Sequence, residues 1–71
     1  MRLHKYKKEG GANIVVDLNE IETVSTFDRD GQYITQLGMK SGTRWNLDRA
    51  HNLNDVVQIW RETTQPTNLE R

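Results

Sequence analysis

The stretch from Tyr33 to Leu47 constrains the fold most, because two runs of alternating side chains are joined there by a short turn. A repeat of two residues places successive side chains on opposite faces of a strand, so each run predicts a β-strand. Residues 40–42 separate the runs, and the glycine among them can adopt the positive φ that a short hairpin loop needs. The odd-numbered face of this hairpin is predicted to form the core. It carries Tyr33, Leu37, Met39, Trp45 and Leu47.

The length of 71 residues allows one domain, which we place at residues 1–63, followed by a flexible tail at residues 64–71. A chain of this size buries only about 60% of its unfolded surface, so its core is marginal without added support. The sequence contains no cysteine, which excludes disulfides and thiolate metal sites. His4 and His51 lack neighbouring ligands at metal-binding spacing, and we predict neither a metal nor a cofactor. Self-association is therefore the expected source of support, giving a homo-oligomer.

The charge of the chain does not favour nucleic acid or an anionic membrane as a partner, because ten basic and ten acidic side chains cancel. No apolar run approaches the roughly 20 residues of a membrane span. The N-terminal residues also lack the apolar region of a secretory signal. We therefore expect a soluble protein of the cytoplasm, which agrees with the absence of cysteine.

Three further strands are predicted before the central hairpin. Residues 2–8 suit an edge strand whose lysines discourage pairing with other sheets. A glycine pair at residues 10–11 forms a turn, and residues 12–17 pair back onto the first strand. Apolar residues recur every third position across residues 21–27, where β-branched and small residues disfavour a helix, so we predict a strand with a bulge or a strong twist. Residues 28–31 then form a polar loop.

One helix is predicted at about residues 52–63, after which Pro66 prevents its continuation. Asn52 is a suitable N-cap, and Asp55 three residues later favours the positive end of the helix. An apolar stripe should cover one open face or end of the sheet. We also expect the two tryptophans, Trp45 and Trp60, to pack on each other where helix meets sheet. The stripe consists of Leu53, Val56, Val57 and Trp60.

The predicted fold is mainly β, with about five strands in a small curled antiparallel sheet or SH3-like barrel and one C-terminal helix. The run from Asp17 to Val24, residues 34–37, a glycine turn at Gly42 and a terminal helix resemble the FlbD family over roughly residues 13–60. That family consists of small flagellum-associated proteins, so the resemblance implies a flagellum-associated role. Proteins of this build are also common in bacteriophage genomes, where they often bind a host protein or a small molecule.

An enzyme is not expected. Serines, histidines and carboxylates are present, but no spacing unites them into a known catalytic constellation, and so small a chain can hardly enclose a pocket alone. Asp28, Asp30 and Gly31 are similar to the start of a calcium loop. However, Leu37 stands where the closing glutamate would be, and the segment is interpreted as an ordinary turn.

Three binding functions stay open, and we prefer a module that self-associates and acts through protein interaction, with Tyr6 and Tyr33 as exposed contacts. Such a module could be a phage-encoded modulator of a host protein. The alternative is sequestration of a nucleotide-like anion at a subunit junction, where arginine or lysine donors would lie beside an aromatic platform. Single-stranded nucleic-acid binding comes third. The candidate interaction residues are Tyr6, Tyr33, Lys40, Arg44, Trp45 and Arg49.

Overall fold

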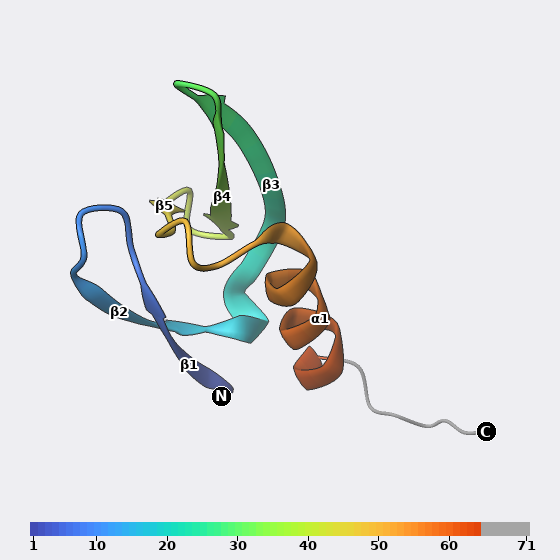
Figure 1. Cartoon of the computed structure of the whole chain (residues 1–71). Coiled ribbons are helices and arrows are strands. Elements are labelled where there is room, and N and C mark those ends of the chain that lie inside the picture. Colours follow the sequence, from blue (N-terminus) through green and yellow to red (C-terminus); the bar gives the residue numbers. More distant parts are fainter. Residues whose placement is uncertain (65–71) are drawn as a thin grey trace.

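The structure is a computed structural model that describes residues 1–64. It confirms a mainly β fold, with five strands in two antiparallel sheets and one C-terminal helix (Figure 1). Among the described residues, no helix has the length and apolar character required to cross a membrane. The elements are β1 (Leu3–Lys7), β2 (Asn13–Asp17), the 3₁₀ turn η1 (Leu18–Glu20), β3 (Ile21–Arg29), β4 (Gln32–Met39), β5 (Arg44–Asn46) and α1 (Leu53–Thr64).

The first sheet is the β1–β2 hairpin that the sequence predicts. The two strands pair antiparallel, with Lys5 opposite Val15, and the turn between them has positive φ angles at Gly10 and Gly11. After β2, the carboxylate of Asp17 accepts hydrogen bonds from the backbone amides of Arg2 and Asn19, at 3.1 and 3.0 Å. These two bonds lower the pKa of the Asp17 carboxyl.

The second sheet has the order β3-β4-β5 and confirms the central hairpin. The turn between β3 and β4 has positive φ at both Asp30 and Gly31, as a two-residue hairpin with the twist of its strands requires. The predicted bulge in β3 is confirmed, because the register with β4 shifts between Ile21 and Thr23. Across from Thr23 lies Gly38, where a Cβ atom would collide with the hydroxyl of Thr23.

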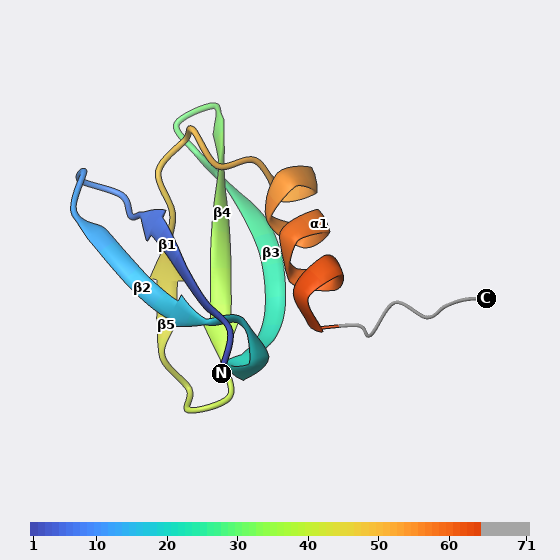
Figure 2. The same ribbon diagram turned by 90° about the horizontal axis from the view of Figure 1, so that it is seen from below.

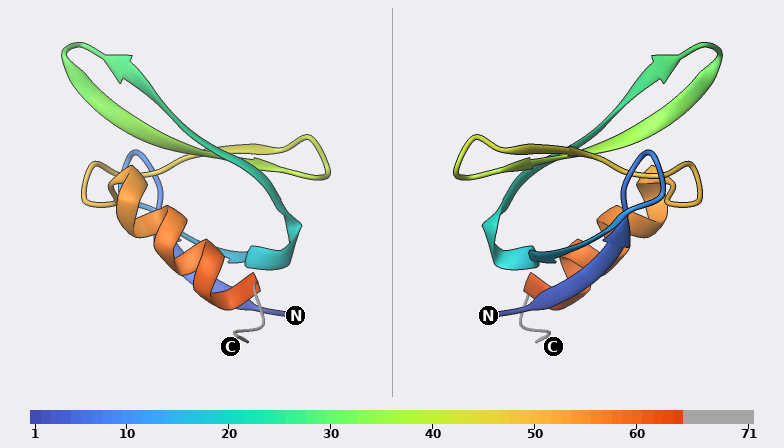
Figure 3. Two further views of the ribbon diagram at one scale, coloured as in Figure 1. Left: turned by 90° about the vertical axis from the view of Figure 1, so that its right-hand side faces the viewer. Right: turned by 90° about the vertical axis from the view of Figure 1, so that its left-hand side faces the viewer.

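The two sheets meet at a narrow connection and do not form one closed barrel. A single bridge pairs Lys8 with Leu47, and it is flanked by hydrogen bonds from Glu9 N to Asn46 O at 2.8 Å and from Asp48 N to Lys7 O at 2.9 Å. Figures 2 and 3 show that α1 lies beside β3, along the open side between the sheets. The SH3-like barrel is therefore not confirmed.

The core lies between the sheets and α1. The odd-numbered face of β4 is buried at Thr35, Leu37 and Met39, as predicted. The prediction is wrong for Tyr33, which is 75% exposed, because the β3–β4 hairpin projects beyond the layer that covers the rest of the sheet (Figure 3). The core cluster consists of Tyr6, Val16, Leu18, Ile21, Leu37, Met39, Leu47 and Val56.

Tyr6 corrects a second expectation, because only 1% of it is exposed. In β1 the residues alternate between faces, and the face that holds Tyr6 is turned toward the core. The ring of Tyr6 lies 4.5 Å from that of His4 and meets the ring of His51 edge-on at 5.1 Å. Its hydroxyl has no hydrogen-bond partner within residues 1–64, and burial raises the pKa of the phenol.

The helix begins with the predicted cap. The side chain of Asn52 accepts a hydrogen bond from Asp55 N at 2.9 Å and donates one to the carboxylate of Asp55 at 3.1 Å. Of the predicted stripe, Val56 is buried and Trp60 packs against the core, and Ile59 joins them although the sequence did not single it out. The helix runs to Thr64, and residues 65–71 of the predicted tail lie outside the described part of the chain.

Candidate functional site

The free edge of β2 is the main candidate for an interaction surface. Lys7 donates its amide to His51 Nε2 and accepts a hydrogen bond from Asp48 N, so its backbone groups point away from β2. Antiparallel pairs alternate between hydrogen-bonded and non-hydrogen-bonded positions. The residues opposite Lys7, Lys5 and Leu3 therefore direct their N–H and C=O groups away from β1. These residues are Asn13, Val15 and Asp17.

The composition of β2 leaves this edge unguarded. Exposed edges are usually protected by lysine, proline or a bulge, and β1 carries two lysines of this kind. The β2 sequence, Asn-Ile-Val-Val-Asp, contains neither lysine nor proline, and its register with β1 has no shift. Val15 is 61% exposed at the middle of the edge, and the neighbouring Leu3 on β1 is 60% exposed. The edge thus combines unpaired backbone groups with exposed apolar side chains.

A groove of about 270 Å³ adjoins β2 on the side of the β4–β5 hairpin. Residues 15–17 of β2 form one wall, and Met39, Thr43 and Trp45 contribute to the other. The ammonium group of Lys8 lies 5.5 Å from the ring centre of Trp45, in a cation–π arrangement. Trp45 is half-buried where it lines this groove. Its predicted packing against Trp60 stays a prediction.

The six predicted contact residues do not form one surface. Tyr33 and Arg49 line a common groove of about 350 Å³ beside the start of α1. Lys40 and Arg44 are exposed at the β4–β5 hairpin, close in sequence to Trp45. The prediction that Tyr6 is an exposed contact is wrong, since it is a core residue. Tyr6 is therefore not available to stack on a base, as the hypothesis of single-stranded nucleic-acid binding requires of its aromatic side chains.

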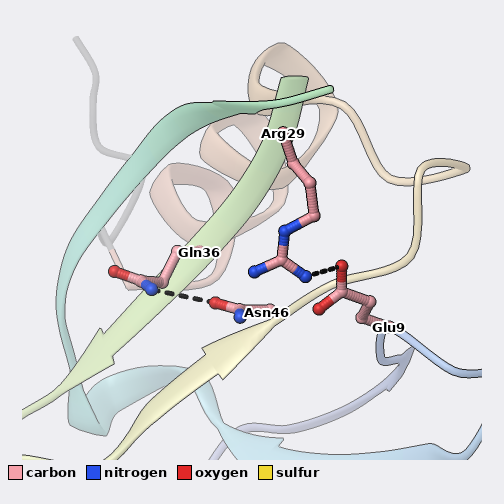
Figure 4. Close-up of polar contacts among 4 residues, drawn as sticks. All are labelled: Glu9, Arg29, Gln36 and Asn46. Atoms are coloured by element: carbon pink, nitrogen blue, oxygen red, sulfur yellow. Dashed lines mark hydrogen bonds and ion pairs between the residues drawn. The ribbon is translucent and has the colours of Figure 1, made fainter. Parts of the chain in front are cut away.

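A second groove, of about 330 Å³, shares Arg49 with the first and also contains an ion pair. Figure 4 shows this pair, in which Arg29 of β3 contacts Glu9 of the β1–β2 turn. The same view shows Gln36 donating to Asn46 at 2.8 Å, between β4 and β5. The Arg29 guanidinium is thus neutralised by Glu9. Within residues 1–64, Arg49 has neither an ion pair nor a side-chain hydrogen bond.

The geometry does not assemble a metal centre from the described residues, where no three His, Asp or Glu side chains are grouped to hold an ion. Asp28 instead accepts a hydrogen bond from Gly31 N at 2.9 Å, which is the ordinary turn that the sequence predicts. The absence of enzymatic activity stays a prediction.

Sequence reasoning missed two features of these surfaces. The sequence does not predict that His51 joins β1 to β4, through Lys7 N and through its carbonyl, which accepts from Thr35 Oγ1 at 3.1 Å. The second feature is the exposure of Val15 at a free strand edge. This edge could have been predicted from the sequence, because the β-branched run at residues 14–16 contains neither a charge nor a proline and so marks a strand that is open to pairing.

Comparison of the chain with protein-family models, with curated proteins and with solved structures gives no match. The resemblance to the FlbD family and the phage origin therefore stay predictions, as does the cytoplasmic location.

Proposed function

We propose that this protein is a binding module that self-associates through the free edge of β2 and acts through protein interaction. In the proposed dimer, β2 of one copy pairs antiparallel with β2 of a second copy. The two β1–β2 hairpins then form one four-stranded sheet across a two-fold axis. Such an interface is isologous, because each copy contributes the same residues.

The observation that carries the proposal is the position of the outward-facing backbone groups. A two-fold axis at Val15 places this residue opposite its own copy, and Asn13 opposite Asp17. Asn13 and Val15 direct both their N–H and C=O groups to the free edge, and Asp17 directs its N–H there, whereas the Asp17 carbonyl begins η1. The Val15 pair can therefore form both of its hydrogen bonds, and each flanking pair can form the one from Asp17 N to Asn13 O. The strand can thus satisfy most of its unpaired groups with a second copy of itself.

The side chains are compatible with the same register. Val15 meets Val15 of the second copy, which buries the exposed apolar surface of both. The Asn13 amide lies beside the Asp17 carboxylate, so no two like charges face each other. On the opposite face, Ile14 meets Val16 and continues the apolar layer. The β2 strand of the second copy would also extend the curled sheet. Its closure into an SH3-like barrel stays a prediction.

The test is sedimentation velocity of the wild-type chain and of Val15→Lys over a range of concentrations. We expect a concentration-dependent dimer for the wild type. For Val15→Lys, two ammonium groups face each other on the axis, and we expect at least a tenfold weaker association, equal to about 1.4 kcal/mol. The matched control is Leu3→Lys, which removes a similarly exposed apolar side chain from β1 and leaves the β2 edge intact.

A charge swap tests the symmetry directly. Val15→Lys and Val15→Glu should each associate poorly alone, whereas their mixture should form a heterodimer that native mass spectrometry resolves. A wild-type chain that stays monomeric up to about 1 mM would overturn the proposal, since a partner that weak supplies only about 4 kcal/mol. Dimerisation of Val15→Lys at the wild-type affinity would overturn it as well.

A further inference from the structure

We propose that the groove shared by Tyr33 and Arg49 binds a nucleoside monophosphate, with the base on the tyrosine ring and the phosphate on the guanidinium. This Tyr33–Arg49 groove lies within one chain and does not include β2, so the inference is independent of the proposed self-association. Its lining consists of Thr26, Tyr33, Thr35, Arg49, Asn52, Leu53 and Asn54.

The charge of the groove selects an anion. Among the described residues that line it, Arg49 is the one charged residue and there is no carboxylate, whereas Glu9, Asp30 and Asp48 line the adjoining groove that Arg49 shares. Arg29 provides the contrast, because Glu9 already neutralises it in the adjoining groove. The Arg49 guanidinium has no partner within residues 1–64, so its fork of N–H donors is available for a phosphate.

An exposed aromatic ring on the same groove selects a planar ligand. Tyr33 is 75% exposed, although burying a tyrosine ring removes much apolar surface from water. Bases stack on such rings with about 1–3 kcal/mol per base, largely independently of sequence. The β3–β4 hairpin fixes the backbone of Tyr33, because the turn and strand pairing are regular there.

The free polar groups of the lining suit the edge of a base. Thr35 donates to the His51 carbonyl, and Asn52 is bonded to Asp55, so neither is available. Asn54 has no side-chain hydrogen bond among the described residues and is exposed at the first turn of α1. Its amide offers both donors and an acceptor.

The size of the groove limits the ligand. Its volume of about 350 Å³ lies near the lower end of the roughly 300–1,000 Å³ of small-molecule sites. One base, one sugar and one phosphate match this scale better than a dinucleotide. This placement differs from the subunit junction that the sequence suggested for a ligand.

The test is an NMR titration of the uniformly labelled protein with adenosine monophosphate, with adenosine and inorganic phosphate as separate arms. We expect saturable shifts at the Tyr33, Arg49 and Asn54 amides. Adenosine and phosphate should each bind at least tenfold more weakly than the nucleotide, because each engages only one half of the groove. If phosphate binds as tightly as the nucleotide, the assignment of a nucleotide is overturned.

Two variants separate the contribution of the phosphate contact from that of base stacking. Arg49→Gln should weaken nucleotide binding about tenfold or more and leave adenosine binding unchanged, while Tyr33→Ala should weaken both. Arg44→Gln is the control, since it removes an exposed arginine outside the groove. Equal binding by Arg49→Gln and the wild type, or the absence of saturable shifts, would overturn the inference. Val15→Lys should bind the nucleotide normally, so failure of one proposal is distinguishable from failure of the other.

Discussion

Tyr6 departs most from what its residue type and position indicate. A tyrosine on a short, lysine-rich edge strand suggests an exposed contact, yet this side chain is at the centre of the core. Its ring is flanked by the imidazoles of His4 and His51, and its hydroxyl is buried without a partner. A buried donor that is left unpaired costs about 1–3 kcal/mol. The ring therefore stabilises the fold, and the hydroxyl opposes it.

Replacing Tyr6 by phenylalanine should leave the free energy of unfolding unchanged or raise it by about 1 kcal/mol, because the ring stays and the unpaired hydroxyl is removed. Urea denaturation measures the difference. The raised pKa of Tyr6 adds a pH test, because the fold favours the neutral phenol over the phenolate. The stability that this pKa difference contributes is fully present below the unfolded-state pKa and is lost as the pH rises through the folded-state pKa. Tyr6→Phe should lack this alkaline loss. A decrease above about 1 kcal/mol at neutral pH would show that the hydroxyl has a partner.

Among the secondary-structure elements, the β3–β4 hairpin has the most strongly specified register. Its turn requires positive φ at two consecutive residues, and its other end carries the bulge after Ile21. Just beyond the bulge, the hydroxyl of Thr23 occupies the space next to Gly38 that a side chain would need. A one-residue slip would therefore place a larger residue against Thr23. Local packing and turn geometry thus select the same pairing.

The change Gly38→Ala should destabilise the protein by about 0.5–1.5 kcal/mol, because the added methyl group forces the Thr23 side chain away from its present rotamer. Thr23→Ala alone should cost less, because Thr23 is exposed. In the double variant the methyl group finds room, and most of the cost of Gly38→Ala should disappear. Thermal or urea unfolding of the four proteins gives the coupling energy. Additive costs would show that Thr23 does not restrict position 38.

In the whole molecule, His51 connects parts of the chain that no strand pairing joins. Its Nε2 accepts from Lys7 N of β1 at 3.0 Å, and its carbonyl accepts from Thr35 of β4 at 3.1 Å. Its ring also contacts Tyr6 edge-on. The acceptor role requires the proton of the neutral imidazole to be on Nδ1. His51 therefore adds a side-chain link between the two sheets to the backbone bridge at Lys8 and Leu47.

His51→Ala should lower the free energy of unfolding by about 0.5–1.5 kcal/mol, since it removes the hydrogen bond to the exposed Lys7 amide and opens space beside Tyr6. His51→Gln should recover part of the loss, because its amide oxygen can accept the same hydrogen bond. His4→Ala is the control, as His4 also contacts Tyr6 but has no side-chain hydrogen bond among the described residues. Urea denaturation and hydrogen exchange at the Lys7 amide measure these effects. Equal losses for His51→Ala and His4→Ala would contradict the role of His51.

The features that the sequence predicts well are local ones. Alternation, glycine turns and the Asn52 cap depend on a few consecutive residues, and they correctly indicate all five strands, the bulge and the helix. Burial of Tyr6 and exposure of Tyr33 depend on which distant segments cover each strand, and alternation carries no such information. For the same reason, the sequence offers Arg49 as one of three donors and Tyr33 as one of two aromatic platforms for a nucleotide-like anion, without indicating which of them lie together. Only the folded chain brings Arg49 and Tyr33 to one groove.

The segment 48–51 is attached to the first sheet on both sides of Arg49. Its two ends are fixed to Lys7, through Asp48 N and His51 Nε2, and Arg49 lies between these anchors. The Tyr33–Arg49 groove therefore depends on a strand that does not line it, because contacts to Lys7 of β1 hold the segment that presents Arg49.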